Sequence, residues 1–111
     1  MPDELELSPH EVQSRLAQGD RLVMVDVREP EEFAITRIEG AQLISMQSVP
    51  SEFQRLESMS DDASLVIVCH HGVRSLQVAA WLRERGLNNC FSLAGGIDRW
   101  SREIDPMLAR Y

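Results

Sequence analysis

One short loop of this sequence gathers a thiol, two imidazoles and a guanidinium: Cys69-His70-His71-Gly72-Val73-Arg74-Ser75. Four residues separate Cys69 from Arg74. If the loop curls into an arc, its backbone N–H groups point inward and form an anion-binding nest, and Gly72 permits the positive φ that a close approach needs. A thiol at the base of such a nest is favoured as the thiolate, which is an activated nucleophile.

The remaining side chains of the loop supply charge and hydrogen bonds around the thiol. Arg74 adds a fixed cation, and His70 and His71 add positive charge when they are protonated. Ser75 either hydrogen-bonds to the sulfur or caps the next helix, and the sequence leaves both roles open. A metal site made of Cys69 and the two histidines is the weaker interpretation, because adjacent residues rarely converge on one ion and no fourth ligand is visible.

The elements on either side of the loop determine where the thiol lies. Residues 65–68 are apolar and mostly β-branched, which is typical of a fully buried strand, and residues 74–85 predict a packed helix. Cys69 therefore lies at the carboxyl end of a buried strand and faces the amino end of a helix, where unsatisfied N–H groups favour the thiolate. Cys90, in another predicted strand, is interpreted as a small buried hydrophobic residue.

Two opposite charges, Asp26 and Arg28, stand at the end of a second apolar run, residues 22–25. Charged residues in this position form either a structural ion pair or part of a site at the carboxyl edge of the sheet. We favour the structural ion pair, because the covered end of a strand leaves such charges in need of partners. Asp26 and Arg28 are therefore expected to support the site.

The rest of the chain predicts an alternation of helices and strands. A capping box begins a helix over residues 8–19, and residues 29–33 predict a short helix with acidic residues in its first turn. A third helix is expected to be capped by Ser48 or Ser51 and to be ended by the polar residues 58–64. Further predictions are short strands at 42–44 and 89–93 and a last helix that holds Ile97 and Trp100.

The strands read as continuous apolar runs separated by helices. This pattern is typical of a parallel sheet that is covered by helices on both faces. We therefore predict an α/β fold in a single domain over residues 1–111. Ligands of such folds bind beyond the carboxyl ends of the strands, which is where the predicted strand 65–68 leads into Cys69.

The composition is acidic: 11 Lys and Arg against 18 Asp and Glu give a formal charge of -7. This balance argues against nucleic acid as a partner, because binding would require phosphate neutralisation. No apolar run approaches the roughly 20 residues of a membrane span, and no signal-peptide pattern opens the sequence, so we expect a cytoplasmic protein without a membrane partner. Two Cys residues without metal-ligand spacing suggest neither zinc nor a disulfide scaffold.

Four separated motifs of this chain resemble the single-domain rhodaneses, a family of sulfurtransferases. The motifs are DVREPEEF (26–33), IEGA (38–41), CHHGVRS (69–75) and LAGGIDRW (93–100). Their order and spacing are specific, and the resemblance covers nearly the whole chain. Family positions that usually hold Gly, His and Pro are occupied by Thr36, Arg37 and Glu39, and Ser45 replaces a further Pro. These departures lie outside the Cys69 loop and concern its rim.

The resemblance implies a mostly five-stranded sheet and a two-step sulfur relay. Cys69 would take the outer sulfur of thiosulfate or a similar small anionic donor and become a persulfide. Cyanide or a thiol, either a small thiol or a thioredoxin-like protein, would then remove that sulfur. The family requires no metal or organic cofactor, and it gives Asp26 and Arg28 a structural role near the site. The substrate-binding residues would be His70, His71, Gly72, Val73, Arg74 and Ser75.

Three other functions compete with this interpretation. A Cys-dependent phosphatase or arsenate reductase of the related fold also uses a Cys-to-Arg cradle, but its loop is one residue longer, which suits a tetrahedral phosphoryl group. A non-catalytic rhodanese-like binding module would not need the intact Cys69 loop. A carrier that accepts persulfide from another protein would keep the same loop, so only its donor would differ.

Overall fold

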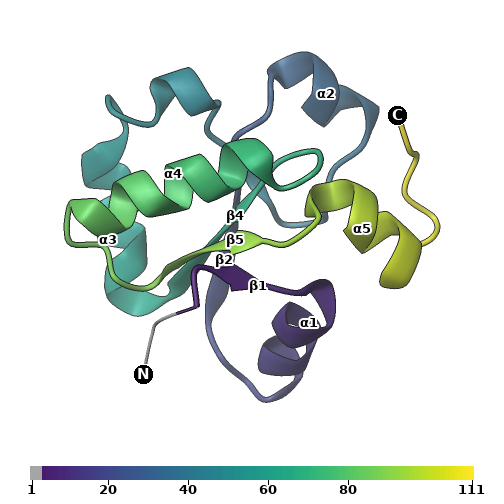
Figure 1. Cartoon of the computed structure of the whole chain (residues 1–111), viewed down its shortest axis with the longest axis horizontal. Helices are drawn as coiled ribbons and strands as arrows, with labels where there is room; N and C mark the ends of the chain where they lie inside the picture. The colour runs from purple at the N-terminus through teal and green to yellow at the C-terminus, as the bar shows by residue number, and fades with distance from the viewer. Residues whose placement is uncertain (1–3) are drawn as a thin grey trace.

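The structure is a computed structural model and describes residues 4–111. Helices and strands alternate along most of the chain (Figure 1), as the apolar pattern predicts. In chain order the elements are β1 (Glu6–Leu7), α1 (Pro9–Ala17), β2 (Leu22–Asp26), α2 (Pro30–Ile35), β3 (Gln42–Leu43), the 3-10 helix η1 (Met46–Ser48), α3 (Phe53–Asp62), β4 (Ser64–Val68), α4 (Val73–Glu84), β5 (Cys90–Leu93) and α5 (Gly96–Glu103).

The five strands form one parallel sheet in the order β1-β5-β4-β2-β3. β4 lies at the centre, and its register with β2 sets Asp26 beside Val68. Both strands end at this level, where the backbone N–H of Val27 donates to the Val68 carbonyl at 2.9 Å. Cys69 therefore leaves the sheet at its carboxyl edge, next to the end of β2. The predicted α/β fold with a five-stranded parallel sheet is confirmed.

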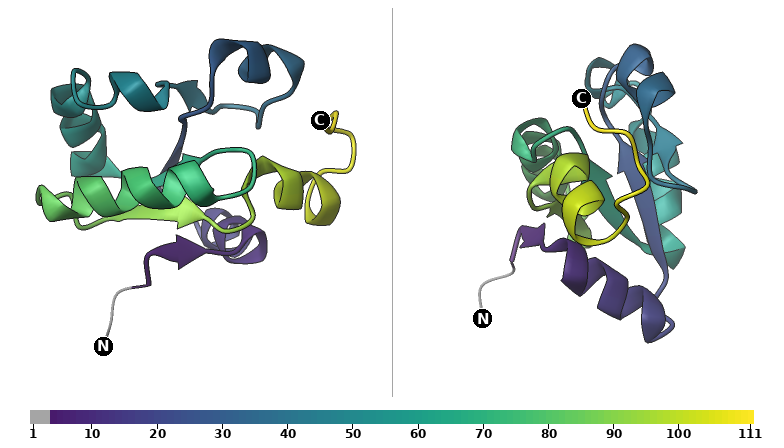
Figure 2. Two further views of the ribbon diagram at one scale, coloured as in Figure 1. Left: turned by 45° about the horizontal axis from the view of Figure 1, so that its top comes forward. Right: turned by 90° about the vertical axis from the view of Figure 1, so that its right-hand side faces the viewer.

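β4 is buried on both of its sides because its residues alternate between two hydrophobic cores. Leu65 and Ile67 pack in the core that α3 and α4 cover, while Val66 and Val68 pack in the core that α1 and α5 cover. Figure 2 shows these helices as layers on the two sides of the sheet. Burying each of these side chains contributes roughly 1.5–3 kcal/mol, so the strand that leads into Cys69 is firmly held on both faces.

The structure corrects several predicted boundaries. The edge strand β1 is too short to show an apolar periodicity, and the sequence did not predict it. Neither Ser48 nor Ser51 caps α3: Ser48 ends the 3-10 helix η1, and α3 starts after Glu52 without a side-chain cap. α3 also continues through the polar residues expected to end it, because Met59 still packs against the core while its polar neighbours face solvent.

The first helix begins with the predicted capping box, in which Ser8 and Glu11 bond to each other's backbone N–H groups. Among residues 4–111, the helices are all too short or too polar to cross a bilayer.

The first turn of α5 closes directly onto the Cys69 loop. The backbone N–H of Ile97 donates to the Cys69 carbonyl at 2.8 Å, and that of Asp98 donates to the His70 carbonyl at 3.1 Å. Gly96 makes this approach possible because it has φ of +63° and leaves no room for a Cβ, which would collide with those two carbonyl groups. The glycine pair at the start of α5 therefore has a packing role as well as a turn role.

We expect Gly96→Ala to destabilise the protein more than Gly19→Ala does. Both glycines have positive φ, so both changes carry a backbone strain of about 1–2 kcal/mol. A Cβ at Gly19 meets nothing within 4 Å, whereas one at Gly96 forces α5 away from the loop. This overpacking adds about 1–3 kcal/mol, measurable by urea unfolding. Equal losses in the two variants would contradict the close packing of α5 on the loop.

Candidate active site

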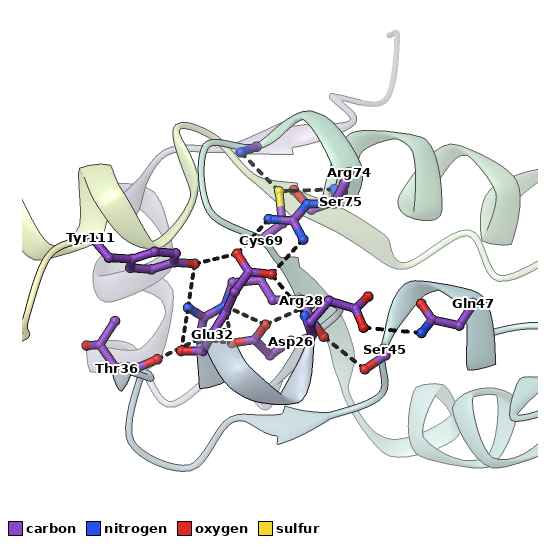
Figure 3. Close-up of polar contacts among 12 residues, drawn as sticks. Asp26, Arg28, Glu32, Thr36, Ser45, Gln47, Cys69, Arg74, Ser75 and Tyr111 are labelled. Atoms are coloured by element: carbon purple, nitrogen blue, oxygen red, sulfur yellow. Dashed lines mark hydrogen bonds and ion pairs between the residues drawn. The ribbon is translucent and has the colours of Figure 1, made fainter. Parts of the chain in front are cut away.

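The sulfur of Cys69 lies inside a cradle of hydrogen-bond donors at the end of β4. The backbone N–H groups of Gly72 and Ser75 point at Sγ from 3.1 and 3.3 Å (Figure 3). Gly72 has φ of +98° and forms the N-cap of α4, so the loop turns sharply and the amino end of that helix faces the sulfur. Cys69 is only 1% exposed. Backbone donors and the amino end of α4 therefore converge on this one atom.

The hydroxyl of Ser75 also faces the sulfur, which settles the two roles that the sequence left open. Gly72, not Ser75, occupies the N-cap of α4. The Cys69 thiol donates to Ser75 Oγ at 3.3 Å, and this hydroxyl pairs with Ser92 Oγ at 2.7 Å. When the thiol loses its proton, Ser75 can donate to the sulfur and accept from Ser92. Ser92 was missed in the sequence, because nothing in its local pattern distinguishes it from other strand residues.

Arg74, the cation of the Cys69 loop, forms an ion pair with Glu32. Its Nη1 and Nη2 donate to the two carboxylate oxygens of Glu32 at 2.9 and 3.1 Å. This pairing with Glu32 raises the pKa of Arg74, and a negative Cys69 raises it further. The same contact lowers the pKa of Glu32 to about 2. Arg74 is therefore a permanently charged group whose orientation is set by a carboxylate from α2, a partner that the sequence analysis did not predict.

Asp26 and Arg28 form a fully buried ion pair beneath this layer. Arg28 Nη2 donates to Asp26 at 2.7 Å, and both side chains have 0% exposure. Further guanidinium N–H groups donate to the carbonyls of Thr36 and Glu32 and to the hydroxyl of Tyr111. A buried charge with so many partners connects neighbouring segments of the chain.

Two aromatic contacts cover the other side of the loop. The Tyr111 ring stacks on His70 with a centroid distance of 3.8 Å and an interplanar angle of 7°. His70 in turn stacks on His71 at 3.9 Å. Burial, together with the neighbouring His71, lowers the pKa of His70 and favours its neutral form. Tyr111 was missed in the sequence, because no motif connects it to the loop.

One group of side chains near the loop has atoms of the type that bind metals. Ligand atoms of His70, His71 and Asp98 lie within 4.8 Å of one another. However, Asp98 already accepts from the guanidinium groups of Arg102 and Arg110. A cation at this place would have to displace both arginines, so the donor set fits a metal poorly.

The side chains of Val73 and Cys90 do not surround the sulfur of Cys69: one lies at the surface of the loop, and the other lies at the far end of the sheet. The side chain of Val73 is 67% exposed on the first turn of α4, so it belongs to the rim of the loop. Cys90 is fully buried at the amino end of β5, paired with Leu65 at the amino end of β4. Burial raises the pKa of its thiol to about 11. Cys90 therefore lies at the opposite end of the strands from Cys69 and is an inert thiol.

We expect the Glu32–Arg74 pair to stabilise the protein above pH 4.5 and to lose this effect as the pH falls toward 2. The pKa of Glu32 is lowered by folding from 4.5 to about 2, so the folded state favours its ionised form. Glu32→Gln should therefore flatten the acid limb of the free energy of unfolding plotted against pH.

Urea unfolding at a series of pH values measures this difference. Glu31→Gln is the matched control, since the described residues offer Glu31 no cation partner. The control curve should run parallel to that of the unchanged protein. An equal slope for Glu32→Gln and the unchanged protein would show that the ion pair does not persist in solution.

Comparison with known proteins agrees with this architecture. Residues 8–103 match the family described as the rhodanese-like domain. The thiosulfate sulfurtransferase GlpE of Haemophilus influenzae is 35% identical over 107 residues, which is 96% of each chain. The probable adenylyltransferase/sulfurtransferase MoeZ of Mycobacterium tuberculosis is 33% identical over 105 residues, but the chain spans only 26% of that relative's length.

Among solved structures, the human single-domain sulfurtransferase TSTD1 superposes with a TM-score of 0.75 at 31% identity. The match covers 91% of this chain and 98% of the human one. With the Cys69 loop at the carboxyl edge of a five-stranded parallel sheet and a family match that spans most of its length, the chain belongs to the rhodanese-like domain family.

Proposed function

We propose that this protein is a thiosulfate sulfurtransferase that carries a sulfur atom as a persulfide on Cys69. The observation that carries the proposal is the cradle around Sγ, in which two backbone N–H groups and the Ser75 hydroxyl surround one atom. Such a cradle stabilises negative charge on Sγ, both when the thiolate attacks the donor and when Sγ leaves again as the thiolate, and it needs no metal or organic cofactor. The names of the relatives from H. influenzae and human support the same reaction class.

In the first half-reaction, the Cys69 thiolate attacks the outer sulfur of thiosulfate. A bond forms between Sγ and that sulfur, and the sulfur–sulfur bond of thiosulfate breaks. Sulfite leaves with the electron pair of the broken bond, and the negative charge stays on the terminal sulfur of the Cys69 persulfide. The N–H groups of Arg74 that Glu32 does not use are available for the donor's sulfonate oxygens.

In the second half-reaction, an acceptor removes the terminal sulfur. Cyanide attacks that sulfur and leaves as thiocyanate, while the bonding pair returns to Sγ as the thiolate. A thiolate acceptor, from a small thiol or a thioredoxin-like protein, becomes a persulfide in the same way. We place the reaction in the cytoplasm, where thiols stay reduced and available.

The proposed roles follow the loop residue by residue within a single domain over residues 1–111. Cys69 is the catalytic nucleophile, and Asp26 and Arg28 support the edge of the sheet on which it stands. Residues His70 to Val73 bind the substrate through backbone N–H groups and through the exposed rim of the loop. Arg74 and Ser75 bind it through hydrogen-bond donors of their side chains. A non-catalytic module would not need this arrangement, and a phosphatase would need the longer loop. A persulfide-accepting carrier remains compatible and differs only in its donor.

We expect the protein to gain one sulfur atom when it is incubated with thiosulfate and freed of excess donor. Intact mass spectrometry measures the gain, and cyanide should remove it. Cys69→Ser should show no gain, because it lacks the nucleophile. Cys90→Ala is the matched control and should gain sulfur as the unchanged protein does. A gain that persists in Cys69→Ser would overturn the assignment, and phosphatase turnover without any gain would favour the rival reaction.

We expect Arg74→Ala to lower kcat/KM for thiosulfate by roughly tenfold to a hundredfold, since charge-assisted contacts to the donor are lost. Its cost in stability should be within about 1 kcal/mol, because the Arg74–Glu32 pair is partly exposed. Arg21→Ala is the control and should change neither quantity, because Arg21 is exposed before β2 and its side chain makes no hydrogen bond or ion pair among residues 4–111. Parallel losses of stability and turnover in Arg74→Ala would argue that the residue is structural.

A further inference from the structure

The segment that follows α5 returns across the carboxyl edge of the sheet to α2 (Figure 2). It ends this path with Tyr111, whose hydroxyl lies between two charged side chains from α2 and the end of β2. Arg28 Nη1 donates to Tyr111 Oη at 2.8 Å, and Tyr111 Oη donates to Glu32 Oε2 at 2.8 Å. Figure 3 shows the hydroxyl pointing at both partners. The hydroxyl thus accepts one hydrogen bond from Arg28 and donates another to Glu32, which connects the two side chains.

The chain of hydrogen bonds from Arg28 through Tyr111 to Glu32 is rigid at its Arg28 end. Arg28 is fully buried and held by the carboxylate of Asp26, so its Nη1 is a fixed donor. Because the Tyr111 hydroxyl is held by Arg28, its own hydrogen bond restrains the carboxylate of Glu32. Without the hydroxyl, the Glu32 carboxylate would retain as partners only the backbone N–H of Glu29 and the partly exposed Arg74. Glu32 is therefore anchored to the protein interior through Tyr111.

The other end of the chain reaches the reactive loop. Glu32 accepts from both terminal nitrogens of Arg74, and this bidentate contact fixes the plane of the guanidinium. Arg74 is a long side chain about one-third exposed, so without such a contact it would sample many rotamers. The orientation of the cation beside Cys69 thus depends on a hydroxyl that contacts neither the sulfur nor the loop backbone.

The ring of Tyr111 contributes a separate contact. It stacks on His70, the residue after Cys69, with nearly parallel planes. The hydroxyl and the ring therefore act on different parts of the site: the hydroxyl on the Glu32–Arg74 pair, and the ring on the loop itself. Because a Phe side chain keeps the ring and lacks the hydroxyl, the two contributions can be separated by substitution.

We propose that Tyr111 is a positioning residue for the anionic donor, acting through Glu32 to orient Arg74. This inference rests on the proposed sulfur transfer. The dianion thiosulfate depends on a directed guanidinium for its binding, whereas the acceptor attacks a terminal sulfur that is already covalently attached to Cys69, and the backbone N–H groups hold the Sγ of that residue. Loss of the hydroxyl should therefore slow the donor half-reaction selectively. General loosening of the fold would slow both halves alike.

The test measures the two half-reactions separately in Tyr111→Phe. In a substituted-enzyme mechanism, kcat/KM for thiosulfate reports the first half and kcat/KM for cyanide reports the second. We expect the first to fall about fivefold, on the scale of one ordinary hydrogen bond because the lost bond acts on Arg74 only through Glu32, and the second to change less than about twofold. Met107→Ala is the matched control, because Met107 is an exposed residue of the same segment.

A second variant and a second readout complete the test. Tyr111→Leu also removes the ring from His70, so it should slow both half-reactions. In spectra of the protein labelled with ¹⁵N, the Nε–H signal of Arg74 should broaden in Tyr111→Phe and stay unchanged in Met107→Ala. If the unchanged protein acquires no cyanide-labile sulfur, the proposed function fails. If it does, and Tyr111→Phe alters neither half-reaction or both equally, the positioning role of Tyr111 is wrong.

Discussion

The buried guanidinium of Arg28 is the constraint on which the arrangement of the site depends. A charge removed from water must find a partner for nearly every N–H group, or the fold loses several kcal/mol. The partners here come from β2, from α2 and its C-cap, and from the segment after α5. One charge thus draws three separate segments together at the carboxyl edge of the sheet. Glu32 faces the Cys69 loop because α2 is held in this position.

The parts of the structure that the sequence predicted are those set by local patterns. The capping box at Ser8, the apolar runs of β2 and β4, and the glycine at the turn of the loop each show their role within a few residues. The parts that it could not predict are contacts across the chain. Ser75 meets Ser92 over a separation of 17 residues, and Arg28 meets Tyr111 over 83. A serine within a strand has no pattern that reveals what faces it in a neighbouring layer.

Glu32 shows how a correct local interpretation can miss the site. As an acidic residue in the first turn of α2 it fits the dipole of that helix, and this explanation is sufficient in the sequence alone. Its carboxylate instead neutralises Arg74, so the two together carry no net charge beside the loop. An anionic ligand would therefore meet directed N–H groups at this site, and the positive field at long range would be weak. This fits a protein whose formal charge is -7 and which cannot rely on steering anions from a distance.

The contact of α5 with the loop also fixes the direction of two carbonyl groups that lie next to the sulfur in the chain. The carbonyl oxygens of Cys69 and His70 accept hydrogen bonds from the N–H groups of Ile97 and Asp98. Their lone pairs are thereby engaged on the side of α5, and the N–H groups of Gly72 and Ser75 turn inward. Among residues 4–111, the hydrogen-bond partners of the sulfur do not include α5. The helix nevertheless engages two carbonyl oxygens of the loop that would repel negative charge on Sγ if they faced it.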